Sequence, residues 1–373
     1  MKKLIAMILA LVMILSLVAC GASQAPATEA PKAEAPAAEA PKAETPAPAE
    51  RKAYKVGFSN SYNGNTFRQT LEADFKAVAD ELVAQGVVSE YTMAVSNNDN
   101  TQQISQVQSF ILDGCDIIII DPGSATALND VIDEAVAAGI IVFVISDGPV
   151  TTDTCYQLNT DGYACMNEVA DAVCEIAGPD KKALLVRGIT GLEIEQLFYE
   201  GHYDAAIEHG YEVVGEVEGQ WTDSVAKEAL AAVLPSLNYD VDVIMGQGGD
   251  DLVAAELFEE AGKDIPVIVG SNRGGFLRWW AHAYEEFGYE TASTATEAAL
   301  GSIALRIAID ILDGKVTLNE NEMYCGGTLL TQEMLVADLE TFKNFDPDGM
   351  FFEPRDHQWI VDNIYSVYGT YAG

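Results

Sequence analysis

Short apolar runs rich in β-branched residues alternate with helical patterns along most of this chain, from Tyr54 onward. The run Ile117–Ile120 contains no polar residue. A strand that is apolar at every position is typical of a parallel sheet buried on both faces. The runs predict eight strands, Tyr54–Ser59, Tyr91–Ser96, Ile117–Ile120, Ile140–Ser146, Ala183–Arg187, Tyr211–Val217, Val243–Gly246 and Val267–Gly270.

Helical spacing of apolar residues fills the intervals between these runs and predicts helices at about 193–209, 223–237 and 250–261. Two successive βαβ arrays predict an α/β fold with two doubly wound parallel-sheet lobes. A length of 373 residues also fits two domains. In such folds ligands bind at the carboxyl ends of the strands.

The first twenty residues have the pattern of an export signal. Lys2 and Lys3 precede the apolar run Leu4–Val18, which is short for a membrane span but fits a secretory signal. The run ends in Ala19-Cys20 and resembles the bacterial lipobox, in which the cysteine is lipidated and becomes the mature N-terminus. We therefore expect residues 1–19 to be a signal peptide and Cys20 to carry a lipid that anchors the protein to the cell membrane outside the cytoplasm. A plain signal peptide with an incidental cysteine is the alternative.

A proline-rich segment follows, with a proline at every fifth residue from Pro26 to Pro46 among Ala, Glu and Lys. Such a segment has little apolar surface to bury and favours extended polyproline II. Residues 20–53 are therefore expected to form the lipidated cysteine and a tether.

The charge balance excludes some partners. Twenty Lys and Arg against fifty-eight Asp and Glu give a net charge of −38. Nucleic acid needs a basic surface, and anionic lipid repels an acidic one. A neutral or cationic small ligand is compatible with this charge, and solubility alone is another explanation for it.

Five cysteines remain besides Cys20, and none shows the C-x-x-C spacing of metal or redox sites. Buried apolar thiols are expected, although a disulfide that involves Cys155 stays open. The sequence lacks the G-x-S-x-G, G-x-x-x-x-G-K-[ST] and H-E-x-x-H motifs, so we expect neither an enzyme nor a bound cofactor or metal.

Glycine, asparagine and other polar residues gather where the expected strands end. Turn formation or helix capping explains each of these loops taken singly. Their recurrence in two matching halves favours a shared ligand site. The loops are Ser59–Arg68, Ser146–Gly148, Arg187–Gly191, Gly246–Asp251 and Gly270–Gly275.

From about Tyr54 to Thr331 the order of these motifs resembles the type I periplasmic solute-binding proteins of ABC importers, in the ribose/galactose-binding branch. The matching motifs are Gly57-Phe58-Ser59, Asn65-Thr66-Phe67, Asn97-Asn98-Asp99, Ile120-Asp121-Pro122, Ser146-Asp147, Gly188-Ile189-Thr190-Gly191, Gln247-Gly248-Gly249-Asp250 and Gly270-Ser271-Asn272. The resemblance implies two lobes joined by three hinge crossings that close on a ligand. It implies an N-terminal lobe of residues 54–159 and 296–324, and a C-terminal lobe of residues 160–295 and 325–373 with an aromatic tail.

The resemblance also implies a set of ligand-binding positions. Asp147 matches the aspartate that accepts hydrogen bonds from sugar hydroxyls in this family. Arg68 and Arg273 stand where the ribose pattern has no arginine, which indicates that the cationic donors have moved. The other implied positions are Asn65, Phe67, Gln196, Trp221, Gly249, Asp250 and Asn272.

Departures from the pattern argue against ribose itself and leave a polyhydroxylated ligand. Gly148, Gln196 and Gly249 replace an arginine, an arginine and an asparagine of the family, and its hinge glutamine falls on Ala295. The implied function is that of a monomeric extracytoplasmic lipoprotein that captures a monosaccharide or related polyol for an ABC transporter permease with its ATPase. A lipoprotein that reports ligand to a membrane receptor, or a binder of a non-sugar solute such as a nucleoside, would show the same sequence features.

Overall fold

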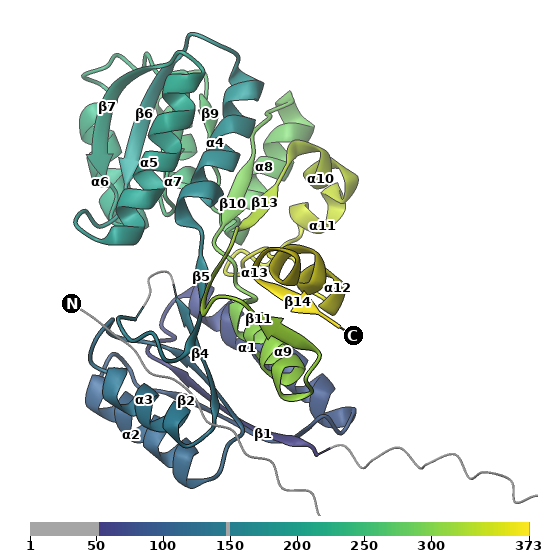
Figure 1. Ribbon diagram of the computed structural model, residues 1–373. Coiled ribbons are helices and arrows are strands. Elements are labelled where there is room, and N and C mark those ends of the chain that lie inside the picture. The colour runs from purple at the N-terminus through teal and green to yellow at the C-terminus, as the bar shows by residue number, and fades with distance from the viewer. Residues whose placement is uncertain (1–51, 147–149, 373) are drawn as a thin grey trace, which may run out of the picture. The chain divides into compact units, whose positions relative to one another are not determined.

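The computed structural model describes residues 52–146 and 150–372, and these residues contain two parallel sheets, one in each lobe (Figure 1). The first sheet has the spatial order β12-β5-β4-β3-β1-β2. Its strands are β1 (Tyr54–Asn60), β2 (Val88–Val95), β3 (Ile117–Asp121), β4 (Ile141–Ser146), β5 (Tyr156–Thr160) and β12 (Glu322–Cys325).

Helices cover both faces of this sheet, as the apolar run in β3 predicts. Ile117 and Ile119 pack into one core with Phe58 and Phe75, while Ile118 and Ile120 pack into another on the opposite face. All four isoleucines are fully buried. The covering helices are α1 (Thr66–Ala84) and α9 (Leu300–Leu312) on the first face, and α2 (Asn100–Leu112) and α3 (Asn129–Ala137) on the second.

The second sheet repeats the arrangement with the order β7-β6-β8-β9. Its strands are β6 (Lys182–Arg187), β7 (Glu212–Glu218), β8 (Val243–Gly246) and β9 (Val267–Ile268). One face packs against α4 (Gly162–Ala177) and α5 (Glu193–Glu208). The other packs against α6 (Asp223–Val233), α7 (Asp251–Ala261) and α8 (Gly274–Phe287).

Within residues 150–372 the chain passes between the two sheets three times: from β5 to α4, from β10 (Ser293–Ala295) to α9, and from β12 to β13 (Thr328–Leu330). Strands β10 and β13 run antiparallel, with Thr294 opposite Leu329. The fold is therefore the two-lobe, three-crossing architecture that the sequence predicts.

The C-terminal tail departs from the expected lobe assignment. Helices α10 (Gln332–Ala337) and α11 (Leu339–Lys343) pack on the second lobe, as expected for residues 325–373. From His357 onward, however, the tail packs against the core of the first lobe, where Ile360, Ile364 and Tyr365 are buried. The last strand, β14 (Gly369–Tyr371), pairs with β11 (Val316–Leu318) of that lobe. The aromatic residues of the tail need apolar cover, and the first lobe provides it.

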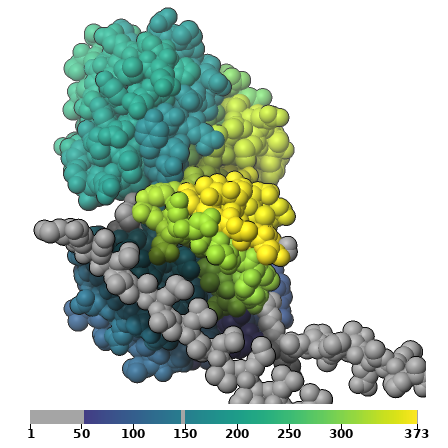
Figure 2. All heavy atoms as spheres, in the orientation of Figure 1, coloured from purple at the N-terminus to yellow at the C-terminus, as the bar shows by residue number. Residues whose placement is uncertain are grey.

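This end of the tail is built from α12 (His357–Ile360), a π-helical turn at Val361–Tyr365, and α13 (Ser366–Tyr368). Figure 2 shows the C-terminal residues, in yellow, as one continuous surface.

Cys115, Cys155, Cys165 and Cys174 are buried thiols without a disulfide, and burial raises the pKa of Cys165 to about 12. Cys325 is buried as well, and its thiol donates to the carbonyl of Asn159 at 3.7 Å. Among residues 52–146 and 150–372 no helix combines the length and the apolar character that a bilayer crossing requires.

Candidate functional site

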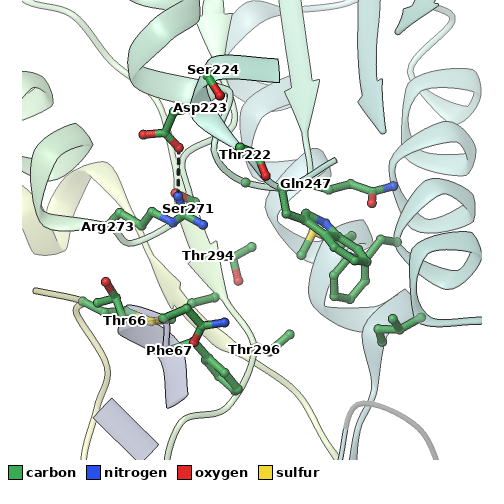
Figure 3. Close-up of a pocket in the computed structure, with 18 residues that line it drawn as sticks. Thr66, Phe67, Thr222, Asp223, Ser224, Gln247, Ser271, Arg273, Thr294 and Thr296 are labelled. Atoms are coloured by element: carbon green, nitrogen blue, oxygen red, sulfur yellow. Dashed lines mark hydrogen bonds and ion pairs between the residues drawn. The ribbon is translucent and has the colours of Figure 1, made fainter. Parts of the chain in front are cut away.

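A cavity of about 720 Å³ lies where the loops of the two sheets meet the hinge strand β10 (Figure 3). The first lobe contributes Asn65, Thr66 and Phe67. The hinge strand and the residue after it contribute Thr294, Ala295 and Thr296. The second lobe and the tail contribute Met166, Ile194, Phe198, Trp221, Thr222, Asp223, Ser224, Gln247, Gly248, Ser271, Arg273 and Met350.

The lining combines hydroxyl and amide groups with aromatic rings. The hydroxyls belong to Thr66, Thr222, Ser224, Ser271, Thr294 and Thr296, and the amides to Asn65 and Gln247. Phe67, Phe198 and Trp221 supply the rings. Pockets with convergent polar groups on an apolar wall orient small ligands that carry several hydroxyls and small apolar faces.

Close contacts fix the position of the Trp221 side chain in this wall. Gln220 and Trp221 both adopt left-handed backbone conformations, with φ of 52° and 51°. The indole lies so close to Gly188 that a methyl group there would be 2.2 Å from its Cε2. The ring meets Phe198 edge-on at 6.5 Å between centroids. Its Nε1–H is buried and has no hydrogen-bond partner among the described residues, so a donor remains unused beside the pocket.

The amide of Gln247 is held by its own lobe. Its Oε1 accepts from the Gly188 N–H at 2.9 Å, and its Nε2 donates to the backbone and side chain of Glu195, each at 3.2 Å. Glu195 is fully buried and makes a bidentate ion pair with Arg187 at 2.8 and 2.9 Å. Because these bonds fix the loop after β6, Gln247 positions the Gly188–Trp221 contact.

One ion pair lies in the pocket wall. Arg273 Nη1 donates to Asp223 Oδ1 at 3.1 Å, and both side chains are exposed (dashed in Figure 3). Ser271 is turned toward α7, since its hydroxyl donates to Asp251 Oδ2 at 2.7 Å.

Of the residues that the sequence singled out, Asn65, Phe67, Trp221 and Arg273 line this pocket. Asn65 also caps α1, because its Oδ1 accepts from the Arg68 N–H at 2.8 Å. Asp147 and Cys20 lie outside the described residues, so their expected roles stay predictions.

Arg68 and Asn272 take other places. Arg68 forms an ion pair with the buried carboxylate of Asp121. Asn272 is fully buried in the left-handed region, with φ of 55°. Its Nδ2 donates to Thr328 O at 2.7 Å, and its Oδ1 accepts from Ser293 Oγ at 2.6 Å. Asn272 therefore joins the loop after β9 to strands β10 and β13.

Gln196, Gly249 and Asp250 are not among the lining residues either. Gln196 accepts from Arg187 at 3.3 Å and donates to Glu200 at 2.8 Å. Gly249 lies against the Trp221 backbone, where a methyl group would be 2.9 Å from its carbonyl carbon.

Asp250 is buried at the start of α7 and accepts from the Gly248 N–H at 2.8 Å. Burial, and the neighbouring charge of Asp251, raise the pKa of Asp250 to about 8. Its carboxyl is therefore largely protonated at neutral pH.

Sequence reasoning missed Phe198, Met166, the hinge threonines and Met350. Phe198 and Met166 sit at ordinary helix positions, where an apolar residue reads as core. Thr294 and Thr296 flank the expected hinge residue Ala295, and this neighbourhood could have pointed to them.

Comparison with known proteins agrees with this architecture. The model of the periplasmic binding protein domain family matches residues 56–316. The ribose import binding protein of Bacillus subtilis is 22% identical over 266 residues, which cover 71% of this chain and 84% of that protein.

Solved structures show the same fold. An ABC transporter solute binding protein from Thermobispora bispora superposes with a TM-score of 0.66 and 28% identity, over 84% of this chain and 95% of that one. One from Bacillus halodurans with bound myo-inositol gives a TM-score of 0.60 and 20% identity, over 79% and 99%.

Proposed function

Because the chain belongs to the periplasmic binding protein family, we propose that it captures a small, neutral, polyhydroxylated solute between its lobes and delivers it to the permease and ATPase of an ABC transporter. A monosaccharide or a related cyclic polyol is the solute class that the pocket fits best.

The pocket lining is the observation that carries this proposal. The hydroxyl groups of the lining and the Asn65 amide offer donors and acceptors for several solute hydroxyls, and three aromatic rings can pack against the C–H faces of a sugar ring. The lining comes from both lobes and the hinge, so a bound solute would satisfy polar groups of both lobes at once. Such differential contacts are what drive a hinge to close on its ligand.

The charges of the lining favour a neutral solute. Of the described residues that line the pocket, Asp223 and Arg273 alone carry a charge at neutral pH, and they pair with each other. A solute carboxylate would be repelled by Asp223 and an ammonium by Arg273, whereas hydroxyl groups are repelled by neither.

The relatives support the same class. Ribose import binding proteins from several bacteria and a putative rhizopine-binding protein from Rhizobium meliloti are similar in sequence. Solved structures of the same fold hold myo-inositol or D-allose.

We further propose that Cys20 carries the lipid that keeps the protein at the outer face of the cell membrane. Each buried acyl methylene contributes about 0.8 kcal/mol, so several chains together anchor a protein stably. Cys20→Ser should release the chain from membranes or stall its processing. A variant that fractionates with membranes as the wild type does would contradict the anchor.

Calorimetry on the full chain tests the solute class. D-ribose, D-allose and myo-inositol serve as neutral probes, and D-glucuronate and D-glucosamine as charged ones of similar size. At a hundred times its Kd, a true ligand adds about 2.7 kcal/mol to the free energy of unfolding, which a thermal shift detects. Tightest binding of a charged probe, or no binding of any neutral one, would contradict the proposal.

A further inference from the structure

Residues 345–372, which we call the C-terminal strap, lie beyond the region matched by the family model and yet reach the pocket. Met350 of the strap lines the cavity together with Phe67, Trp221 and Arg273. One of the described residues that line the pocket therefore comes from a segment that follows the family domain in the chain.

The strap is paired with the pocket loop through its backbone. Arg273 and Met350 form an antiparallel bridge. The Gly274 N–H donates to Gly349 O at 2.8 Å, and the Phe351 N–H donates to Asn272 O at 2.9 Å. Since backbone bonds on both sides enclose the pair, Met350 has a defined place beside Arg273.

Gly274 makes this close approach possible. A methyl group at Gly274 would lie 1.7 Å from the Asp346 carbonyl oxygen, which a side chain cannot do without moving the backbone. The start of α8 and the strap thus fit each other only with glycine at this position.

The far side of the strap is fixed at the hinge. Arg355 Nε donates to Glu297 Oε2 at 2.7 Å, and the two side chains are 9% and 0% exposed. Arg355 Nη2 also donates to Thr328 Oγ1 at 3.3 Å, and the guanidinium lies 4.7 Å from the centre of the Trp359 ring. Met350 is therefore held between an anchor on the second lobe and an anchor at the hinge.

We propose that Met350 is a specificity-determining residue, through which the strap sets the size and orientation of the solute that the pocket accepts. This inference rests on the proposed function, since it assumes a polyhydroxylated solute in this cavity. A methionine side chain adapts its shape to an apolar face, and here it packs against the C–H side of a ring whose hydroxyls meet the threonines and serines. A change in its volume alters the fit of larger probes more than that of smaller ones.

Three variants in the full chain test the assignment: Met350→Ala, Met350→Trp and, as matched control, Met334→Ala. Met334 is a partly buried methionine of α10 that packs on the second-lobe core and does not line the pocket. Calorimetry gives the Kd of each variant for D-ribose, D-allose and myo-inositol.

We expect Met350→Ala to weaken the best wild-type probe at least fivefold and to change the order of preference. Met350→Trp should reduce the affinity for the two six-carbon probes at least tenfold and for D-ribose less. Met334→Ala should lower Tm and leave every Kd within twofold.

If the wild type binds a probe and both Met350 variants keep its Kd within twofold, the inference is overturned and the proposed function stands. A wild-type chain that binds none of the three probes would overturn the proposed function, and the inference with it. Wild-type binding therefore distinguishes the two failures.

Discussion

The two lobes each place an arginine near the start of a helix that follows a strand, and the two arginines have opposite environments. Arg68 in the first lobe pairs with Asp121, and the two side chains are 19% and 1% exposed. Arg273 in the second lobe pairs with Asp223, and these side chains are 43% and 69% exposed. The first arginine is paired within its own lobe, whereas the second is exposed and lines the pocket.

The same difference extends to the other strand ends. In the first lobe the polar groups bond one another: Ser59 donates to Gln106 at 2.9 Å, and Gln103 donates to the Asp121 carbonyl at 2.8 Å. Among the residues that the structure describes, Asn65, Thr66 and Phe67 are what the first lobe contributes to the pocket lining before the hinge, and the second lobe supplies most of the rest. Among the described residues, the polar groups at the first lobe's strand ends are therefore bonded within that lobe, whereas more of the pocket-lining side chains come from the second lobe.

The largest effect expected from this comparison is on stability. Arg68→Met leaves the carboxylate of Asp121 buried without its cationic partner, and its Oδ1 already has no hydrogen-bond partner among the described residues. Removing one member of a buried ion pair costs about 3–5 kcal/mol. Urea unfolding of the full chain measures this loss.

The double variant Arg68→Met/Asp121→Leu serves as control, because it removes the buried charge as well and should recover most of the loss. An Arg68→Met chain of wild-type stability that binds D-ribose or myo-inositol at least tenfold more weakly would erase the contrast between the two arginines.

The sequence predicts the elements and most of the pocket motifs, but not the contacts between residues far apart in the chain. The parallel strands, the three crossings and the pocket residues Asn65, Phe67, Trp221 and Arg273 follow from local patterns and the family resemblance. The partner of Arg68 does not, because Asp121 comes from another strand end, and the pairing depends on how α1 packs over the sheet.

Asn272 shows a second limit. Its place in a pocket loop predicts a ligand contact, but a left-handed backbone turns its amide into the interior between β10 and β13. Met350 shows a third, since it reaches Arg273 from a tail 77 positions further along the chain. Contacts of that range leave no periodic or motif signal.

Asp250 differs from the exposed pocket residues of the second lobe, because its carboxyl is buried and bonded within its own loop. Its folded-state pKa of about 8 is above the ordinary carboxyl value, so the unfolded chain ionises first as the pH rises. This group therefore lowers the free energy of unfolding progressively between about pH 4 and pH 8.

Asp250→Asn removes that ionisation and keeps an oxygen for the Gly248 N–H. We expect equal stabilities near pH 4 and an advantage for the variant of roughly 2–3 kcal/mol at pH 6, at about 1.4 kcal/mol for each unit of pKa difference. Thermal unfolding across this pH range measures it. If the difference in stability between variant and wild type does not change with pH, and the variant binds sugar at least tenfold more weakly, Asp250 belongs to the binding site instead.

Gly188→Ala tests the recognition surface of the second lobe without touching a polar group. The added methyl overlaps the Trp221 indole and must displace it from the pocket wall. Overpacking of this kind costs about 1–3 kcal/mol, and we expect sugar affinity to fall about tenfold or more.

Gly191→Ala is the matched control in the same loop. Gly191 has φ of 94° and open space around it, so its alanine variant is strained but leaves Trp221 in place. It should lose stability and retain affinity. Equal affinity losses in both variants would show that the loop backbone matters rather than the indole.

The smallest effect is expected at Arg273. An exposed ion pair contributes about 0–1 kcal/mol, so Arg273→Met should change the free energy of unfolding by less than that, and its backbone bridge to Met350 is retained. Sugar affinity should fall about tenfold, since the guanidinium is the pocket's charged donor to a solute hydroxyl. Asp223→Asn frees the same guanidinium from its partner and should leave the affinity equal or improved. If Arg273→Met instead costs more than 2 kcal/mol of stability and leaves the Kd unchanged, the second arginine is as structural as the first. The contrast between an arginine buried in its own lobe and an arginine exposed in the pocket wall would then fail.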